Sequence, residues 1–149
     1  MSPALETLHR IFGYSSFRGP QAEIIDHLIA GGDALVLMPT GGGKSVCFQV
    51  PALMKAGTAL VISPLLSLMK DQVDNLEKIG ITDAVTINGL LDPIERGKSF
   101  ERVENGSASL LYISPESLRS KTIERLLLGR KIVRFVIDEA HCFSSWGQD

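Results

Sequence analysis

Short apolar runs alternate with helical patterns along most of this chain, and this alternation restricts the fold more than any other feature of the sequence. Five runs rich in β-branched residues are predicted strands: Ala34 to Pro39, Thr58 to Pro64, Ala84 to Asn88, Ser109 to Pro115 and Ile132 to Glu139. None alternates cleanly between apolar and polar residues, which is typical of strands buried on both faces. Strand and helix in repeated order predict an α/β fold of three layers, with helices on both faces of a parallel sheet.

The segments between these runs carry helix signals. In Leu65 to Gly80, apolar residues recur at spacings of three and four, and Gly80 is placed to end the helix. Asp92 to Glu95 is a helix start, with Asp92 as the cap and Glu95 in position for a capping box. Further helices are expected near Pro3 to Phe12, near Pro20 to Ala30 and from about Lys44.

Length and composition fit one domain with a core. The chain has 149 residues, 44% of them hydrophobic, and a net charge of −2, so any basic patch for nucleic acid must be local. Cys47 and Cys142 match no metal-ligand spacing and are predicted to be ordinary semi-buried thiols in a reducing compartment. No apolar run approaches the roughly 18 residues of a membrane span, and no signal peptide is evident. We therefore expect a cytoplasmic protein, nuclear in a eukaryote, without a membrane partner.

The motif MPTGGGKS, Met38 to Ser45, follows the first predicted strand and precedes a predicted helix. Backbone N–H groups of a glycine turn and of a helix N-terminus together form an anion site, so the motif predicts polyphosphate binding. Lys44 is expected to reach the β- and γ-phosphates, and the Ser45 hydroxyl is expected to hold Mg²⁺. The predicted cradle is completed by Thr40, Gly41, Gly42 and Gly43. A glycine-rich turn with an incidental lysine is the alternative.

The motif VIDEAH, Val136 to His141, ends the last predicted strand. Asp138 is expected to orient Mg²⁺ through its waters, and Glu139 is expected to polarise the attacking water, as phosphoryl transfer requires. An acidic pair after an apolar strand is common. Its combination with a phosphate loop upstream makes the prediction of nucleotide hydrolysis specific.

Five motifs in order resemble the RecQ-type DNA helicases of helicase superfamily 2. They are Phe12 to Gln21, Met38 to Leu53, Val61 to Val73, Tyr112 to Leu118 and Asp138 to Asp149. The first, FGYSSFRGPQ, and the last, DEAHCFSSWGQD, separate RecQ-like enzymes from other DEAH-box proteins. Met38 stands where the strict phosphate-loop pattern has glycine, a position that helicase-type loops relax. The resemblance implies the RecA-like, ATP-binding motor lobe of a 3′-to-5′ DNA helicase that acts in recombination and repair.

The resemblance also indicates which residues bind the base of ATP. It implies that Gln21 reads the adenine edge while Tyr14 and Arg18 flank the base. An amide can donate to and accept from adenine, and both guanidinium and phenol groups stack on aromatic faces. A surface turn that leads into a helix is the alternative for Tyr14 and Arg18.

Two further motifs are implied to bind single-stranded DNA. Ser63 and Ser114 each precede a proline and a predicted helix, whose N-terminal amides suit a phosphate backbone; plain helix capping is the alternative. Phe143 and Trp146 resemble the start of an aromatic-rich loop that stacks on bases, with a core position as the alternative for Trp146. His141 is expected to contact the phosphate or to link it to the DNA-binding side, unless it is a capping or surface histidine.

Compared with the family, residues 1–149 correspond to an incomplete first lobe that stops within the aromatic-rich loop. The second lobe with its arginine finger and the zinc-binding and winged-helix regions are expected to be absent. The alternative function is therefore a nucleotide-binding remnant without helicase activity. A small-molecule kinase would leave the adenine, Ser63 and aromatic motifs unexplained.

Overall fold

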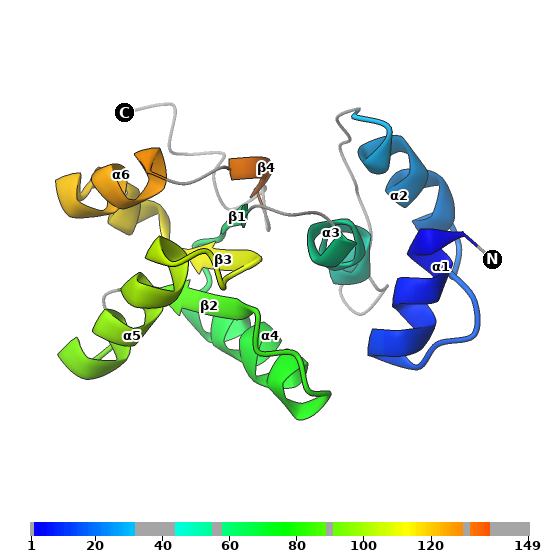
Figure 1. Ribbon diagram of the computed structural model, residues 1–149, viewed down its shortest axis with the longest axis horizontal. Coiled ribbons are helices and arrows are strands. Elements are labelled where there is room, and N and C mark those ends of the chain that lie inside the picture. The colour runs from blue at the N-terminus through cyan, green and yellow to red at the C-terminus, as the bar shows by residue number, and fades with distance from the viewer. Residues whose placement is uncertain (1, 32–43, 55–57, 89–90, 130–131, 138–149) are drawn as a thin grey trace. The chain divides into compact units, whose positions relative to one another are not determined.

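Figure 1 shows the computed structural model of the chain, which describes residues 2–31, 44–54, 58–88, 91–129 and 132–137. The chain divides into two compact units, residues 1–56 and 57–149. The first predicted strand, Ala34 to Pro39, lies outside the described residues. Each unit is described by itself below.

Helices are the only regular elements among the described residues of the first unit. Its elements are α1 (Pro3–Thr7), the π-helical turn η1 (Leu8–Phe12), α2 (Gln21–Ile29) and α3 (Lys44–Met54). Ser2 caps α1 by accepting a hydrogen bond from the Leu5 N–H at 3.2 Å, and α1 continues directly into η1. These bounds confirm the helices predicted near Pro3 to Phe12, near Pro20 to Ala30 and from Lys44.

The helices of the first unit enclose a small apolar core. α1 and α2 both contact α3, and the three lie side by side in Figure 1. The buried members of the core are Ala4, Leu8, Ile25, Val46 and Val50. Phe12, the last residue of η1, and Phe17, within the loop that joins η1 to α2, are partly buried against this core. Aromatic packing therefore anchors the loop at its start and near its middle.

The second unit contains a sheet of four parallel strands. They are β1 (Thr58–Ile62), β2 (Ala84–Ile87), β3 (Leu110–Ile113) and β4 (Ile132–Ile137), in the order β2-β3-β1-β4. The three pairings are all parallel, and Ile113 lies opposite both Ile62 and Ile87. Nearly every side chain of β1, β2 and β3 is buried, as their continuous apolar runs predict.

The helices of the second unit begin and end at the predicted signals. They are α4 (Leu66–Lys78), α5 (Pro93–Glu104), the 3₁₀ helix η2 (Pro115–Arg119) and α6 (Lys121–Leu128). α4 ends before Gly80, whose φ is 86°, and the next N–H, that of Ile81, donates to the Leu76 carbonyl at 2.9 Å. The Asp92 carboxylate accepts from the Glu95 N–H at 2.8 Å, which confirms Asp92 as the cap of α5.

Helices cover both faces of this sheet. One core cluster joins strand residues such as Leu60, Val85 and Leu111 to Val103 of α5 and Ile123 of α6. From β1 to β2 the chain moves along the sheet in the direction opposite to its two later crossovers. Right-handed crossovers therefore put α4 on the face opposite α5 and α6. The predicted α/β class, a parallel sheet between helices, is confirmed.

Candidate functional site

The predicted base-binding residues lie on the loop between η1 and α2 and on the first turn of α2. The Tyr14 side chain is 57% exposed, and its ring stacks on Phe12 with 6.5 Å between the centroids and an angle of 5° between the planes. Arg18 is also exposed. Tyr14 and Arg18 are thus accessible to a ligand, and Tyr14 is backed by a ring that is itself packed on the core.

Gln21, unlike Tyr14 and Arg18, is buried, with only 3% of the residue exposed. Its side-chain oxygen accepts a hydrogen bond from the Arg18 N–H at 2.8 Å, and its own N–H donates to the Arg18 carbonyl at 3.0 Å. Gly19, between them, has a φ of 49°, a conformation that glycine adopts without strain. The paired bonds fix Arg18, four residues after Tyr14, against the start of α2.

The structure adds His9 to this segment. The ring of His9, on η1, donates from Nε2 to the Ser15 carbonyl at 2.6 Å and so ties the loop to the helix that precedes it. The sequence analysis missed His9, because a histidine on a short amphipathic helix carries no signal for a bond to a loop six residues ahead.

The predicted phosphate-binding residues centre on the start of α3. Lys44 and Ser45 are its first two residues, its first turn holds no acidic residue, and Ser45 is half-buried. The first N–H groups of a helix lack partners within it and suit an anion, and a serine hydroxyl is a ligand type that Mg²⁺ accepts. This position fits a polyphosphate. Thr40, Gly41, Gly42 and Gly43 lie outside the described residues.

Cys47, one turn further along α3, is an ordinary buried thiol. Only 3% of it is exposed, and burial raises the pKa of its thiol above the usual value. Cys47 is thus more deeply buried than the semi-buried thiol that was predicted. Cys142 lies outside the described residues.

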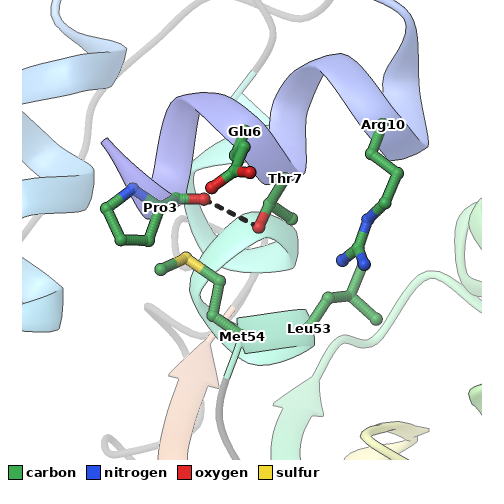
Figure 2. A pocket seen from close by; sticks show the side chains of 6 residues that line it. All are labelled: Pro3, Glu6, Thr7, Arg10, Leu53 and Met54. Atoms are coloured by element: carbon green, nitrogen blue, oxygen red, sulfur yellow. Dashed lines mark hydrogen bonds between the residues drawn. The ribbon is translucent and has the colours of Figure 1, made fainter. Parts of the chain in front are cut away.

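A hollow of about 380 Å³ lies between the first helix and the end of α3 (Figure 2). It is lined by Pro3, Glu6, Thr7, Arg10, Leu53 and Met54. The Thr7 hydroxyl donates to the Pro3 carbonyl at 2.9 Å. Because a helix rises about 1.5 Å per residue, Met54 is about 15 Å along α3 from Lys44. The hollow contains none of the predicted site residues and is separate from the start of α3.

In the second unit, a buried polar residue follows each of three neighbouring strands. Ser63 follows β1, Asn88 follows β2 and Ser114 follows β3, and their exposed fractions are 1%, 5% and 2%. The Ser63 N–H extends the ladder by donating to the Ile113 carbonyl at 3.2 Å. Ser63 and Ser114 each follow a strand, as predicted, and the pairing of β1 with β3 makes them neighbours at the carboxyl edge of the sheet. The sequence analysis did not single out Asn88.

The hydroxyls of Ser63 and Ser114 shape the turns that leave the sheet. Ser63 Oγ accepts from the Leu65 N–H at 3.2 Å, and the Ser114 and Ser117 hydroxyls are 2.8 Å apart. Neither caps an α-helix: Leu65 occupies the cap position of α4, and η2 follows Ser114. Ser120 caps α6 instead, by accepting from the Ile123 N–H. Helix capping, the alternative for both serines, does not apply to Ser63, whereas Ser114 occupies the cap position of η2 without a side-chain bond to a backbone N–H of that helix.

The first two residues of the VIDEAH motif, Val136 and Ile137, are the last two of β4. Ile137, its last residue, lies opposite Ile62, which immediately precedes Ser63. The remaining predicted residues, Asp138, Glu139, His141, Phe143 and Trp146, lie outside the described residues. Within the described ranges, no cluster of side chains could hold a metal ion and no helix is long and apolar enough to cross a membrane.

Comparisons of sequence show which known proteins this chain is similar to. A family model described as DEAD/DEAH box helicase matches residues 18–149. The chain is 47% identical to the ATP-dependent DNA helicase RecQ of Pasteurella multocida and 43% identical to the probable ATP-dependent DNA helicase RecS of Bacillus subtilis. These matches cover 98% and 100% of this chain but 23% and 30% of those proteins. The chain thus spans about a quarter of the length of these relatives, and the resemblance to RecQ helicases is confirmed.

Comparisons of structure agree on the fold. The crystal structure of a hypothetical ATP-dependent RNA helicase from Sulfolobus tokodaii matches with a TM-score of 0.76 and 22% identity, over 99% of this chain and 44% of that one. The DUF1998 helicase MrfA, in a structure with DNA, matches with a TM-score of 0.67 and 20% identity, over 87% of this chain and 19% of that one. Both likenesses support a RecA-like helicase fold.

Proposed function

Because the chain belongs to the DEAD/DEAH box helicase family, we propose that it is the ATP-binding motor lobe of a RecQ-like DNA helicase. The observation that carries the proposal is the packing of the first unit: α2, which begins at Gln21, contacts α3, which begins at Lys44. The proposed base-binding segment and the proposed phosphate-binding helix start thus belong to one compact unit. Relatives named ATP-dependent DNA helicases align with nearly the whole chain.

Adenine is proposed to stack against Tyr14, with Arg18 on its other side and Gln21 at its edge. The exposure of Tyr14 and Arg18 supports this arrangement. The Gln21 side-chain oxygen accepts a hydrogen bond from the Arg18 N–H, so the residue proposed to bind the adenine edge also holds the turn before α2.

The triphosphate is proposed to bind at the start of α3. Thr40 and the three glycines would surround it with backbone N–H groups, and Lys44 would contact the β- and γ-phosphates. Ser45 and Asp138 are the proposed Mg²⁺ residues, and the metal would supply charge neutralisation of the phosphates. Glu139 is the proposed base that orients the attacking water. Lys44, Asp138 and Glu139 are therefore the proposed catalytic residues.

DNA is proposed to lie along the carboxyl edge of the sheet. Ser63 and Ser114 are buried, which supports an indirect role: their hydroxyls hold the turns that lead from the sheet into α4 and η2. α4 has no side-chain cap and no acidic residue in its first turn, which suits a phosphate. His141, Phe143 and Trp146 are proposed to add contacts to the phosphate and the bases.

The direction of movement is proposed to be 3′ to 5′, with roles in recombination and repair, in the cytoplasm or in the nucleus of a eukaryote. Residues 1–149 are proposed to be the first RecA-like lobe. Because charge that develops on the γ-phosphoryl group needs donors on its far side, full turnover is proposed to require a second lobe. A nucleotide-binding remnant without helicase activity remains the second candidate.

ATP hydrolysis with and without single-stranded DNA separates the two candidates. We expect residues 1–149 to bind Mg-ATP weakly without unwinding, and a polypeptide extended through a second lobe to hydrolyse ATP when single-stranded DNA is added. Glu139→Gln should abolish that turnover and keep ATP binding. Turnover by residues 1–149 alone, stimulated by DNA and lost in Glu139→Gln, would show that one lobe suffices. An extended polypeptide that binds ATP but never responds to DNA would favour the remnant.

A further inference from the structure

We propose that His9 is a positioning residue for the base of the bound nucleotide. It holds the loop that carries Tyr14, and through Tyr14 it contributes to the preference for a triphosphate that bears adenine over one that bears no base. This inference rests on the proposed function, since it takes Tyr14 as the ring that stacks on the base.

His9 makes hydrogen bonds on both sides of Tyr14. Its carbonyl accepts from the Gly13 N–H at 3.1 Å, and its ring Nε2–H donates to the Ser15 carbonyl at 2.6 Å. The residues immediately before and after Tyr14 are therefore tied to one residue of η1. A carbonyl can only accept, so Nε2 carries the hydrogen in this arrangement.

The turn that carries His9 is unusual in a way that serves this geometry. η1 is a π-helical turn, which is wider than an α-helical turn and is frequent at functional sites. It is followed by Gly13, whose φ of 73° lies in the left-handed region that glycine favours. The chain reverses there and brings Ser15 back within reach of the His9 ring.

Phe12, the last residue of η1, fixes the ring of Tyr14 as His9 fixes its backbone. The two rings are nearly parallel with their centroids 6.5 Å apart, and Phe12 packs on the core of the first unit. An offset parallel pair of this kind is attractive. Tyr14 thus combines a restrained backbone, a ring supported on one side and a large exposed area.

A restrained Tyr14 favours binding because the loop is ordered before the base arrives. A loop that must be ordered on binding loses conformational entropy at that moment, which lowers affinity. The restraint acts only on ligands that stack on Tyr14. A ligand that consists of phosphates alone would bind at the start of α3 without any contribution from His9.

The test is a double-mutant cycle between His9 and Tyr14, with Mg-ATP and Mg-tripolyphosphate as ligands measured by calorimetry. His9→Ala is expected to weaken ATP about two- to tenfold, the range for one hydrogen bond, and to leave tripolyphosphate unchanged. His9→Gln is expected to restore ATP affinity, because its amide can donate from a similar position. In the Tyr14→Ala background, His9→Ala should add no further loss.

Two matched measurements accompany the cycle. Arg10→Ala removes an exposed side chain from the same turn and is the control, since Arg10 has no hydrogen bond or ion pair to any described residue. Amide hydrogen exchange of residues 13–18 without ligand reports loop order directly. It is expected to rise in His9→Ala and to stay unchanged in Arg10→Ala and in His9→Gln. Circular dichroism establishes that each variant is folded.

The outcomes separate this inference from the proposed function. Two results would overturn the role of His9 and leave the proposed function intact. One is unchanged amide hydrogen exchange of the loop in His9→Ala, and the other is a loss of ATP affinity from His9→Ala that persists in the Tyr14→Ala background. An equal loss for both ligands would also overturn it, because His9 would then support the whole unit. If Tyr14→Ala itself left the preference for ATP over tripolyphosphate intact, the base-binding assignment would fall and the inference with it.

Discussion

The side-chain oxygen of Gln21 accepts a hydrogen bond from the N–H of Arg18, and the N–H of Gln21 returns one to the Arg18 carbonyl. A residue proposed to read adenine is therefore also the residue that shapes the turn in front of its own helix. Its two roles call for two different substitutions. One keeps the acceptor and the other removes it.

Gln21→Glu should keep the bond to the Arg18 N–H and lose the amide donor for adenine. We expect it to melt close to wild type and to lose affinity for ATP but not for tripolyphosphate. Gln21→Ala should show the same ligand effect and also lose about 1–3 kcal/mol of unfolding free energy, because the part-buried Arg18 N–H is left without this acceptor. Equal losses for both ligands in Gln21→Glu would mean that Gln21 is only structural.

Lys44→Ala should weaken Mg-ATP and Mg-tripolyphosphate alike, by roughly ten- to a hundredfold, since a charged hydrogen bond to phosphate is lost. The fold should be unaffected, because a charged side chain in the first turn of a helix contributes little to an apolar core. Lys78→Ala, in the exposed last turn of α4, is the matched control and should change neither affinity. Wild-type affinity for both ligands in Lys44→Ala would contradict the phosphate site.

Cys47 should be almost inert to alkylation in the folded protein. Burial raises the pKa of its thiol, so at any given pH the folded state holds less of the reactive thiolate than an exposed cysteine does. In a Cys142→Ser background, the iodoacetamide reaction should be slow at neutral pH and should accelerate on unfolding in urea. A rate equal to that of a small free thiol would show that α3 opens readily.

Asp92→Ala should destabilise the second unit by about 1 kcal/mol, because the Glu95 N–H loses its capping acceptor. Asp92→Asn keeps an acceptor and should lose much less. Urea denaturation followed by circular dichroism measures both changes. If the two variants were equally unstable, the charge at the helix start would matter more than the cap itself.

Local signals in the sequence predicted the elements well. The four described strands fall within the predicted runs, and Gly80 and Asp92 mark the ends predicted for α4 and α5. Such signals are informative because the residue type itself favours the backbone conformation, or supplies the hydrogen-bonding group, that a helix end needs within one turn. Local signals predicted single elements, whereas the family resemblance predicted the RecA-like fold as a whole.

Bonds between side chains and distant backbone were not predictable. The His9 ring donates to the Ser15 carbonyl because η1 is a π-turn that is followed by Gly13, and nothing in the residue types distinguishes this from an α-helical turn. The grouping of Asn88 with Ser63 and Ser114 requires the strand order, since neighbours in a parallel sheet are far apart in sequence. The serine hydroxyls likewise bond within turns whose shape the sequence left open.

The strand order also has a consequence for how the second unit folds. Ala84 pairs with Leu110, 26 residues on, Ala59 pairs with Leu110, 51 residues on, and Thr58 pairs with Ile132, 74 residues on. Closing a longer loop costs more entropy, so β2 and β3 are expected to meet first and β4 to join last. Although β1 is made before the other three, it keeps an unpaired apolar edge until β4 has been synthesised, and that edge invites association between nascent chains.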